Sequence, residues 1–448
     1  MEFAERLHAL GMSEREAMRK AHMFERCAMA LATLSPSPVA SRDPFAFFVP
    51  GRIEVLGKHT DYAGGRSLLC AMERGFAMLA LPRDDGRVRA IAEASGEIRE
   101  IDPQSELAIG RGDWSAYVRT VSRRVRRDFP TARRGVDIAF VSDLPAASGM
   151  SSSSALVIAV FLALDAANEL RSDATYRRVI TSREVLANYL GAVENGRDFG
   201  AFAGGDGVGT LGGSQDQTAI LCCRPGVLSR YSFCPVRAEG EIVFPADRMF
   251  VVAYSGVAAE KTSNARLRYN EASLAVVEIL ALWNAATAQR DASLADAVVS
   301  AAGAPGEIRA VLRRSRSPGF TPQRLLDRFE QFVTESFDII PRACEAFARG
   351  DRAAVGVEVQ RSQLGVEELL GNQVPETIAL VRLARALGAD AASAFGAGFG
   401  GSVWALVAAE GAEQFAGEWL NAYSMEYPGP ATRAELIVTR PGPGATRL

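Results

Sequence analysis

The sequence predicts an α+β fold in two halves, with the functional site in the cleft between them. Length is the first reason, because 448 residues exceed what one hydrophobic core usually holds. Patterning is the second: strand-like runs mix with helical stretches early in the chain, helices dominate after residue 264, and strands return near the end. The third is that small-residue motifs occur in both halves, so a shared site lies where the halves meet.

The region 1–45 is expected to be a helical N-terminal extension. Ser13 and Glu16 have the spacing of a capping box ahead of an amphipathic stretch, and a Ser-Pro-Ser-Pro run at 35–38 ends that stretch. Strand-like runs and long helical patterns follow. We expect strands at 47–49, 52–56, 77–80, 88–91 and 136–140, and helices at 154–170 and 183–195.

A hinge is expected at 236–248, where Pro235 and Pro245 bracket a charged stretch. Strand-like runs at 227–233 and 249–254 flank it. Helical patterns then dominate 264–390, and a strand–loop pattern returns at 396–408 and 434–438. The sequence therefore predicts a first domain over 46–240 and a second over 241–448.

A loop of small residues, Pro-Ala-Ala-Ser-Gly-Met-Ser-Ser-Ser-Ser at 145–154, runs directly into an apolar helical stretch at 155–164. Small residues let the backbone approach an anion closely, and the first N–H groups of a helix have no intrahelical partner. Serine hydroxyls add donors for phosphate and an oxygen ligand for Mg²⁺. Taken alone, such a run is more typical of a serine-capped core helix. Other segments change this interpretation.

Three further segments complete a pattern. They are Pro-Gly-Arg-Ile-Glu-Val-Leu-Gly-Lys-His-Thr-Asp-Tyr-Ala-Gly-Gly at 50–65, Gly-Gly-Ser-Gln-Asp-Gln at 212–217 and Gly-Ala-Gly-Phe-Gly-Gly at 396–401. Together with the serine loop, their order resembles the GHMP kinase superfamily, and the spacing of the first resembles the galactokinase signature. The resemblance implies an S5-like N-terminal domain, a ferredoxin-like C-terminal domain, and ATP with Mg²⁺ as cofactors.

The resemblance also implies a set of site residues. The catalytic pair would be Asp216 and Arg52. Sugar contacts would come from Lys58, His59, Asp61, Gly213 and Tyr269. The nucleotide would be held by Pro145, Ser148, Gly149, Met150, Ser151, Ser152, Ser153, Ser154 and Gly398, and Mg²⁺ by Ser153 and Glu194.

Each role has a chemical reason. Asp216 would take or orient the proton of the attacking hydroxyl, with Arg52 close enough to keep it ionised. Asp61 accepts two hydroxyl hydrogen bonds at once, which fixes stereochemistry. A structural imidazole remains the alternative for His59, as a solvated helix residue does for Glu194. The glycines at 396–401 would shape the loop under the phosphates, or form a plain strand turn.

Three departures from the galactokinase pattern bear on the substrate. Lys58 stands where the family has a glutamate associated with the sugar's 6-hydroxyl, and Ala147 replaces the first glycine of the phosphate loop. A glycine-rich insertion within 195–209 is suited to a mobile lid. The sequence predicts phosphorylation of an anomeric hydroxyl, with galactose as default. The alternatives are a uronic acid, whose carboxylate would pair with Lys58, and a sugar sensor without turnover.

The composition argues against several classes of protein. A formal net charge of −3 argues against a nucleic-acid or anionic-membrane partner, and no secretory or membrane segment is indicated. Six scattered cysteines and three histidines make a zinc site improbable and favour a reducing cytoplasm. The expected partners are a small sugar and ATP, with the chain a monomer or homodimer.

Lysine is rare in this chain. Among 50 basic residues only Lys20, Lys58 and Lys261 are lysine, and Lys58 and Lys261 lie in or beside motifs.

Overall fold

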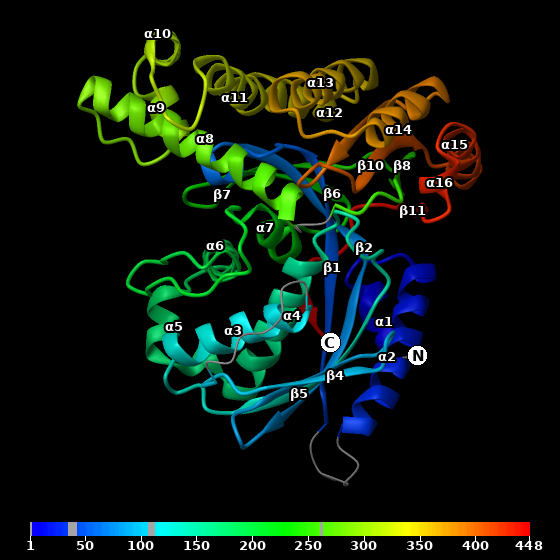
Figure 1. Cartoon of the computed structure of the whole chain (residues 1–448). Coiled ribbons are helices and arrows are strands. Elements are labelled where there is room, and N and C mark those ends of the chain that lie inside the picture. The colour runs from blue at the N-terminus through cyan, green and yellow to red at the C-terminus, as the bar shows by residue number, and fades with distance from the viewer. Residues whose placement is uncertain (1, 35–42, 106–112, 260–262) are drawn as a thin grey trace.

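The computed structural model describes residues 2–34, 43–105, 113–259 and 263–448 (Figure 1). Lys261 lies outside these residues. The elements of the first half are α1 (Glu2–Ala9), α2 (Glu14–Leu34), β1 (Phe45–Leu56), the 3₁₀ turn η1 (Asp61–Ala63), β2 (Arg66–Arg83), β3 (Val88–Ala92), β4 (Glu97–Ile101), α3 (Ser115–Asp128), β5 (Gly135–Ser142), α4 (Ser152–Asn168), η2 (Leu170–Ser172), α5 (Ala174–Val179), α6 (Arg183–Asn195), α7 (Gln215–Cys222), β6 (Val227–Ser232) and β7 (Arg237–Val243).

The second half is mostly helical between its first and last strands. Its elements are β8 (Arg248–Tyr254), α8 (Ser263–Thr287), α9 (Leu294–Val299), α10 (Ala304–Arg314), α11 (Pro322–Thr334), the π-helical turn η3 (Glu335–Ile339), α12 (Ile340–Ala348), α13 (Arg352–Leu364), the π-helical turn η4 (Gly365–Leu370), α14 (Pro375–Ala386), β9 (Ala391–Phe395), β10 (Ser402–Ala408), α15 (Ala412–Glu426), α16 (Pro428–Ala431), β11 (Glu435–Thr439) and β12 (Thr446–Arg447). None of the helices in the described residues is long and apolar enough to span a membrane.

The first sheet, with eight strands in the described residues, has the order β12-β1-β2-β5-β3-β4, and β6 and β7 extend it from β2. α2 packs against β2 and β5, whereas α4 packs against β1 and β2. Figure 1 shows these helices on opposite faces of the sheet, so the sheet is buried on both sides. The chain's last strand, β12, returns to pair with β1.

The second sheet is antiparallel, with the order β11-β8-β10-β9 in the described residues. α14 and α15 cover one face, where Trp419 and Tyr423 are fully buried. The helices α8 to α13 form a separate layer at the top of Figure 1. That layer reaches the first sheet through α12, which packs against β2 and β7.

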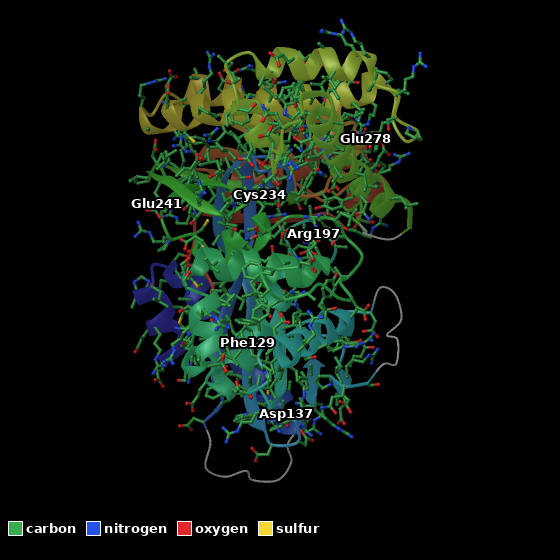
Figure 2. The ribbon with its side chains drawn as sticks, turned by 90° about the vertical axis from the view of Figure 1, so that its left-hand side faces the viewer. Phe129, Asp137, Arg197, Cys234, Glu241 and Glu278 are labelled. Atoms are coloured by element: carbon green, nitrogen blue, oxygen red, sulfur yellow. The ribbon has the colours of Figure 1, made fainter. Side chains whose placement is uncertain are left out.

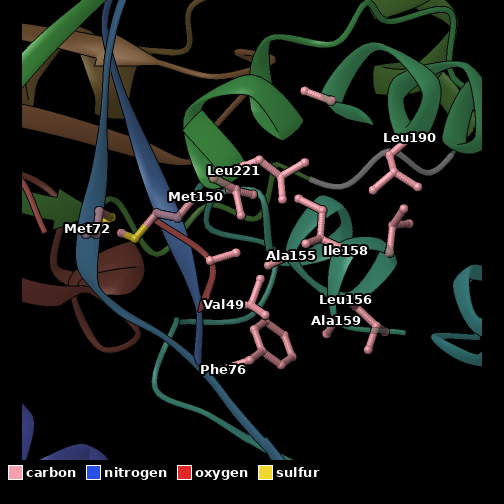
Figure 3. Packing of buried hydrophobic residues seen from close by; sticks show 14 of the residues in the cluster. Val49, Met72, Phe76, Met150, Ala155, Leu156, Ile158, Ala159, Leu190 and Leu221 are labelled. Atoms are coloured by element: carbon pink, nitrogen blue, oxygen red, sulfur yellow. The ribbon is translucent and has the colours of Figure 1, made fainter. Parts of the chain in front are cut away.

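The core of the first half is built around α4. The stretch 155–164 is apolar on every side and buried except at Leu162, because β1, β2, α3 and α6 surround the helix. Figure 3 shows Ala155 and Ile158 of α4 near Val49 and Phe76 of the sheet. This packing fixes the direction of α4, and therefore the place of the serine loop before it.

The structure joins some predicted elements and adds others. The strands expected at 47–49 and 52–56 form one strand, β1, with a bulge between Pro50 and Arg52. At Gly51 an added Cβ would lie 2.8 Å from Leu144 Cδ2 and 3.0 Å from the Met150 carbonyl oxygen, so a larger residue at the bulge would force these neighbours to shift. The predicted hinge at 236–248 is wrong in part, since it contains β7, which pairs with β6. A boundary between 240 and 241 would divide β7, whereas the change of sheet occurs after Val243.

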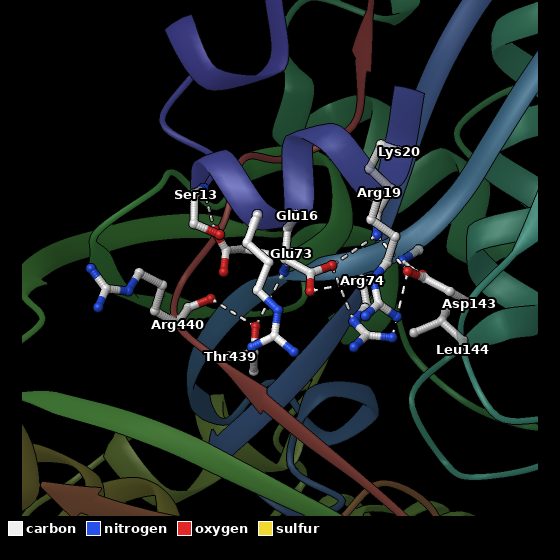
Figure 4. Close-up of polar contacts among 12 residues, drawn as sticks. Ser13, Glu16, Arg19, Lys20, Glu73, Arg74, Asp143, Leu144, Thr439 and Arg440 are labelled. Atoms are coloured by element: carbon white, nitrogen blue, oxygen red, sulfur yellow. Dashed lines mark hydrogen bonds and ion pairs between the residues drawn. The ribbon is translucent and has the colours of Figure 1, made fainter. Parts of the chain in front are cut away.

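The N-terminal helices belong to the first half, as Figure 4 shows. The predicted capping box does not form: the Ser13 backbone N–H donates to Glu73 at 2.5 Å, and Glu16 pairs with Lys20 at 3.2 Å. The fully buried Lys20 also contacts Asp143 Oδ2 at 2.5 Å. Asp143 in turn accepts from the Gly75 N–H at 2.8 Å, so α2 is tied to the segment that enters the serine loop.

Candidate functional site

A cavity of about 1430 Å³ brings the motifs together. Its walls come from β1, the 59–62 turn, α3, the serine loop, the C-terminal end of α6 and the N-terminal end of α7. The second half contributes Ala259, Tyr269, Gly396 and Ala397. The site therefore lies between the two halves, as predicted from the sequence.

Arg52 and Asp216 meet in this cavity. The Arg52 Nε lies 2.7 Å from Asp216 Oδ1, and its Nη1 donates to the Gly149 carbonyl at 2.6 Å. Arg52 is 3% exposed, and its guanidinium lies 5.6 Å from the centre of the Phe395 ring. Asp216 lies in the first turn of α7, where the helix dipole favours a negative charge. A single guanidinium thus links the carboxylate to the serine loop.

Asp61 lies beside this pair on the turn after β1. Its Oδ2 accepts from the Gln215 N–H at 3.1 Å, so α7 positions it. Burial raises the pKa of Asp61, and the backbone N–H of Gln215 opposes that rise. An added Cβ at Gly213 would lie 2.4 Å from Asp61 Oδ2. Gly213 therefore leaves the space that the Asp61 carboxylate occupies, because a side chain at this position would clash with it.

His59 occupies a left-handed backbone conformation with φ of 57°. Its Nδ1 lies 2.9 Å from the Tyr62 hydroxyl and its Nε2 lies 3.2 Å from the Ala397 carbonyl. Burial, with the nearby Arg328 charge, lowers the pKa of His59 to about 4. Its ring centre lies 5.1 Å from that of Tyr269, which also lines the cavity. His59 is therefore a neutral, anchored part of the wall.

Lys58 does not behave as a sugar ligand. It is 1% exposed and is not among the described residues that line the cavity. Its Nζ donates to Ser362 Oγ at 2.8 Å, and Ser362 Oγ donates to Glu335 Oε1 at 3.0 Å. The interpretation of Lys58 as a sugar contact is therefore corrected: the side chain turns away from the cavity into the helical layer.

The serine loop has the backbone of an anion site. Ala147, Gly149 and Ser151 all have positive φ, and Ser151 begins α4 without a side-chain capping bond. The buried hydroxyls of Ser148 and Ser151 have no hydrogen-bond partner within the described residues. Strained backbone and free donors at a helix N-terminus fit a phosphate group. Ser152, Ser153 and Ser154 also line the cavity.

The glycine motif at 396–401 packs directly against the serine loop. Ser402 Oγ donates to the Ser148 carbonyl at 2.7 Å, and an added Cβ at Gly396 would lie 2.9 Å from the Gly149 carbonyl. Gly398 itself faces Asn372, where an added Cβ would lie 2.4 Å from the carbonyl oxygen. Pro145, Met150 and Gly398 are not among the described residues that line the cavity, and Met150 belongs to the core.

Glu194 is buried at the end of α6 and faces the serine loop. Its Oε2 accepts from Ser154 Oγ at 2.8 Å and from Gln217 Nε2 at 2.6 Å. The hydroxyl that touches Glu194 is thus that of Ser154, next to the predicted Ser153. The described residues contain no cluster of three His, Cys, Asp or Glu side chains that could hold a metal. Mg²⁺ commonly takes only one or two protein carboxylates together with phosphate oxygens, so these residues fit it.

One wall of the cavity comes from residues outside the four sequence motifs. Phe76, Trp114, Tyr117 and Phe140 line it, with the Trp114 and Phe140 ring centres 5.3 Å apart. Arg123 on α3 lines the same wall. The signal that could have shown this wall is the helical spacing of apolar residues and arginines across 115–128.

Hydrogen bonds and aromatic packing hold the glycine-rich insertion in this structure, and its role as a mobile lid stays a prediction. Arg124 donates to the Arg197 carbonyl at 3.0 Å, and Arg127 donates to the Gly204 carbonyl at 2.8 Å. Phe199 and Phe202 pair their backbones and pack on Tyr189. Figure 2 shows Arg197 midway between Phe129 in the first half and Glu278 on α8. The end of the insertion, 205–209, lines the cavity.

Comparisons with known proteins show which families and relatives this chain is similar to. Family models match at 39–82 (galactokinase galactose-binding signature), 116–222 (GHMP kinases N-terminal domain) and 343–424 (GHMP kinases C-terminal). A galactokinase from Chloroflexus aurantiacus is 29% identical over 384 residues, covering 84% of this chain and 87% of that protein. One from Actinobacillus pleuropneumoniae is 37% identical over 113 residues, which is 25% of this chain and 29% of that protein.

Solved structures extend the likeness to the fold. The Lactococcus lactis galactokinase complexed with galactose matches with a TM-score of 0.77 and 24% identity, covering 95% of this chain and all of the other. A mevalonate kinase matches with a TM-score of 0.53 and 13% identity, over 88% and 98% of the two chains. The two-domain architecture predicted from the sequence is confirmed.

Proposed function

The chain belongs to the galactokinase family of the GHMP kinase superfamily, and from that premise we propose that it transfers the γ-phosphoryl group of ATP to the anomeric hydroxyl of a neutral hexose, with galactose as the default. The observation that carries the proposal is the bridge made by Arg52. Its guanidinium holds Asp216 at 2.7 Å and the serine-loop carbonyl of Gly149 at 2.6 Å. A base and a phosphate site are thus held side by side.

Phosphoryl transfer depends on positioning and charge neutralisation. Asp216 accepts the proton of the attacking hydroxyl, or orients that hydroxyl, and Arg52 offsets the negative charge that develops beside it. Asp61 fixes the orientation of the sugar by accepting from its hydroxyls. The N-terminus of α4 and the free hydroxyls of Ser148 and Ser151 hold phosphate oxygens.

The residues present also fit the nucleotide and its cation. The aromatic wall of Phe76, Trp114 and Tyr117 offers a flat apolar surface to a purine ring. Glu194, with Ser153 and Ser154, would hold Mg²⁺ through oxygen atoms. A bound Mg²⁺ neutralises charge on the phosphate oxygens.

A neutral sugar suits the cavity better than a uronic acid. The observation that favoured a uronic acid was Lys58, and Lys58 is bonded to Ser362 outside the cavity. The side chains that do face the sugar region include Asp61, Asp216 and Glu54. Asp61 and Asp216 would disfavour a sugar carboxylate, and the nearby Arg52 is already bonded to Asp216 and to the Gly149 carbonyl. A sensor without turnover is less favoured, because Asp216, Glu194 and the serine loop stand together. A cytoplasmic location and a monomeric or homodimeric state stay predictions.

The test is ADP release with a panel of neutral hexoses and uronic acids. We expect turnover of galactose, little turnover of galacturonate, and a fall in kcat of roughly 10²-fold or more for Asp216→Asn with ATP binding retained. The control is Asp84→Asn, since the Asp84 side chain is 76% exposed and lies outside the cavity. Full turnover by Asp216→Asn would remove this residue from the mechanism, and preference for galacturonate would overturn the neutral-sugar proposal.

A further inference from the structure

Glu54 is a buried acid in the cavity wall that no step of the proposed mechanism uses. It follows Arg52 by two positions on β1, so both side chains leave the strand on the same face. Glu54 lines the cavity although it is only 2% exposed. Its Oε1 has no hydrogen-bond partner among the described residues.

The charged groups around Glu54 are already occupied. Arg52 donates to Asp216 and to the Gly149 carbonyl, and Lys58 donates to Ser362. Glu335, the nearby acid on η3, accepts from the Gly57 N–H at 2.7 Å. Burial raises the pKa of Glu54 to about 8, with Arg52 and Lys58 opposing the rise and Asp216 and Glu335 adding to it. At neutral pH a carboxyl group in this state both donates and accepts.

A buried polar atom without a partner is costly, and in a binding cavity the missing partner is a ligand atom. A carboxyl group that can donate and accept matches a hydroxyl, and a sugar presents several hydroxyls. The same cavity also contains Asp61 and Asp216, two further groups suited to hydroxyls.

We propose that Glu54 is a further sugar-binding residue, whose Oε1 forms a hydrogen bond with a hydroxyl of the substrate other than the one that is phosphorylated. This inference rests on the proposed function. Because the site is buried, a sugar that lacks that hydroxyl leaves Glu54 unpaired and is rejected. Glu54 therefore contributes to the selection of one hydroxyl pattern.

The experiment compares galactose with its 2-, 3-, 4- and 6-deoxy analogues in three proteins: the unaltered chain, Glu54→Leu and Glu54→Gln. Dissociation constants from calorimetry without ATP and kcat/KM from ADP release are both measured. In the unaltered chain, loss of the hydroxyl that Glu54 contacts weakens binding by roughly tenfold to a hundredfold. In Glu54→Leu that penalty disappears for this one analogue, while the penalties for the others remain.

The control is Glu73→Gln, since Glu73 is equally buried, accepts from Ser13 and lies outside the cavity. It should leave every penalty unchanged. Glu54→Gln, which keeps size and hydrogen-bonding capacity, should retain part of the selectivity and serves if Glu54→Leu fails to fold. Equal penalties in the unaltered chain and both Glu54 variants would overturn the inference. Sugar binding without ADP release would overturn the proposed function but not Glu54's role, whereas absence of galactose binding would overturn both.

Discussion

Arg52 shows how much of the site depends on one side chain. Its planar guanidinium reaches Asp216 and the Gly149 carbonyl from different nitrogens, and lies over Phe395 of the second half. An ammonium group is a point charge and cannot span both contacts. We expect Arg52→Lys to lower kcat by roughly tenfold or more, with protein stability changed less than activity.

The measurement is steady-state kinetics beside a thermal melt. Arg316→Lys is the control, because Arg316 is an exposed arginine outside the cavity. If Arg52→Lys kept full kcat, the bridge between the carboxylate and the serine loop would not matter for the reaction.

His59 gives the stability a defined pH dependence. The pKa of its ring falls from 6.5 to about 4 in the folded chain, because burial disfavours the charged form. The unfolded chain therefore binds a proton that the folded chain lacks, and stability falls as pH drops from 6.5 towards 4. The shift in the pKa of His59 can lower the free energy of unfolding by at most about 3 kcal/mol over this pH range. Urea unfolding between pH 7 and 4.5 should show a smaller loss for His59→Gln than for the unaltered chain.

The matched control for this pH dependence is His22→Gln, since His22 is exposed on α2. That variant should lose stability with pH as the unaltered chain does. A His59→Gln variant whose stability also followed the unaltered chain would mean that the imidazole is not buried in its neutral form.

At the residue scale, the sequence predicted which residues gather but not where each side chain points. Arg52, Asp61 and Asp216 follow their motifs into the cavity. Lys58 lies one residue before His59, yet its side chain enters the helical layer because Ser362 and Glu335 lie there. Both partners come from the second half, about 300 residues away in sequence, and local pattern contains no information on them.

At the element scale, α11 and η3 hold in place the turn at 57–62 that carries the proposed sugar ligand Asp61, which we call the sugar turn. Arg328 Nη2 donates to the His59 carbonyl at 2.5 Å, Gln331 donates to the Lys58 carbonyl at 3.1 Å, and Glu335 accepts from the Gly57 N–H at 2.7 Å. Arg328 is fully buried and lies 5.7 Å from the centre of the Tyr62 ring. α11 and η3 thus fix backbone groups of the three consecutive residues 57–59.

We expect Arg328→Met to raise the KM for the sugar by roughly tenfold while the KM for ATP stays close to that of the unaltered chain, since the change loosens the sugar turn and leaves the serine loop intact. Separate titrations of the two substrates test this. Arg316→Met is the surface control. An equal rise in both KM values would indicate general loss of structure instead.

The insertion at 195–209 illustrates a limit of composition as a guide. Its six glycines suggested mobility, yet several of them permit tight contacts: at Gly196 an added Cβ would lie 2.4 Å from the Gly205 carbonyl.

The short elements β9 and α7 are not predicted by the sequence pattern, because each is stabilised by its neighbours rather than by its own pattern. Long periodic segments such as α4 and α6 were predicted well.

Hydrogen exchange can test the anchored insertion. The N–H groups of Phe199, Phe202 and Val208 are bonded to backbone carbonyls, so we expect them to be protected in the sugar-free protein. Arg127→Ala removes the bonds to the carbonyls of Ala203 and Gly204 and should raise the exchange rate locally. Fast exchange in the unaltered chain that slows only with galactose would support the lid interpretation.

At the scale of the whole molecule, the N-terminal helices are part of the first domain. α2 buries Phe24 and Leu31 against Phe48 and Leu79 of the sheet. The ends of the chain also meet this sheet, since β12 pairs with β1. The sequence predicted a helical extension from its amphipathic pattern, but that pattern does not say which surface the apolar face covers.

Deletion of residues 1–34 should therefore abolish folding, although none of the described residues 2–34 lines the cavity. The deletion exposes one face of the sheet and leaves Asp143 without Lys20 at the entry to the serine loop. We expect the truncated chain to lose its cooperative thermal transition and its kinase activity together, as measured by circular dichroism and ADP release. A full-length Met29→Ser variant is the control, because Met29 on α2 is 66% exposed and should tolerate the change. A truncated chain that melted cooperatively within a few degrees of the full chain would show that the sheet does not need α2, and the loss of activity alone would then point to the Lys20 contact with Asp143.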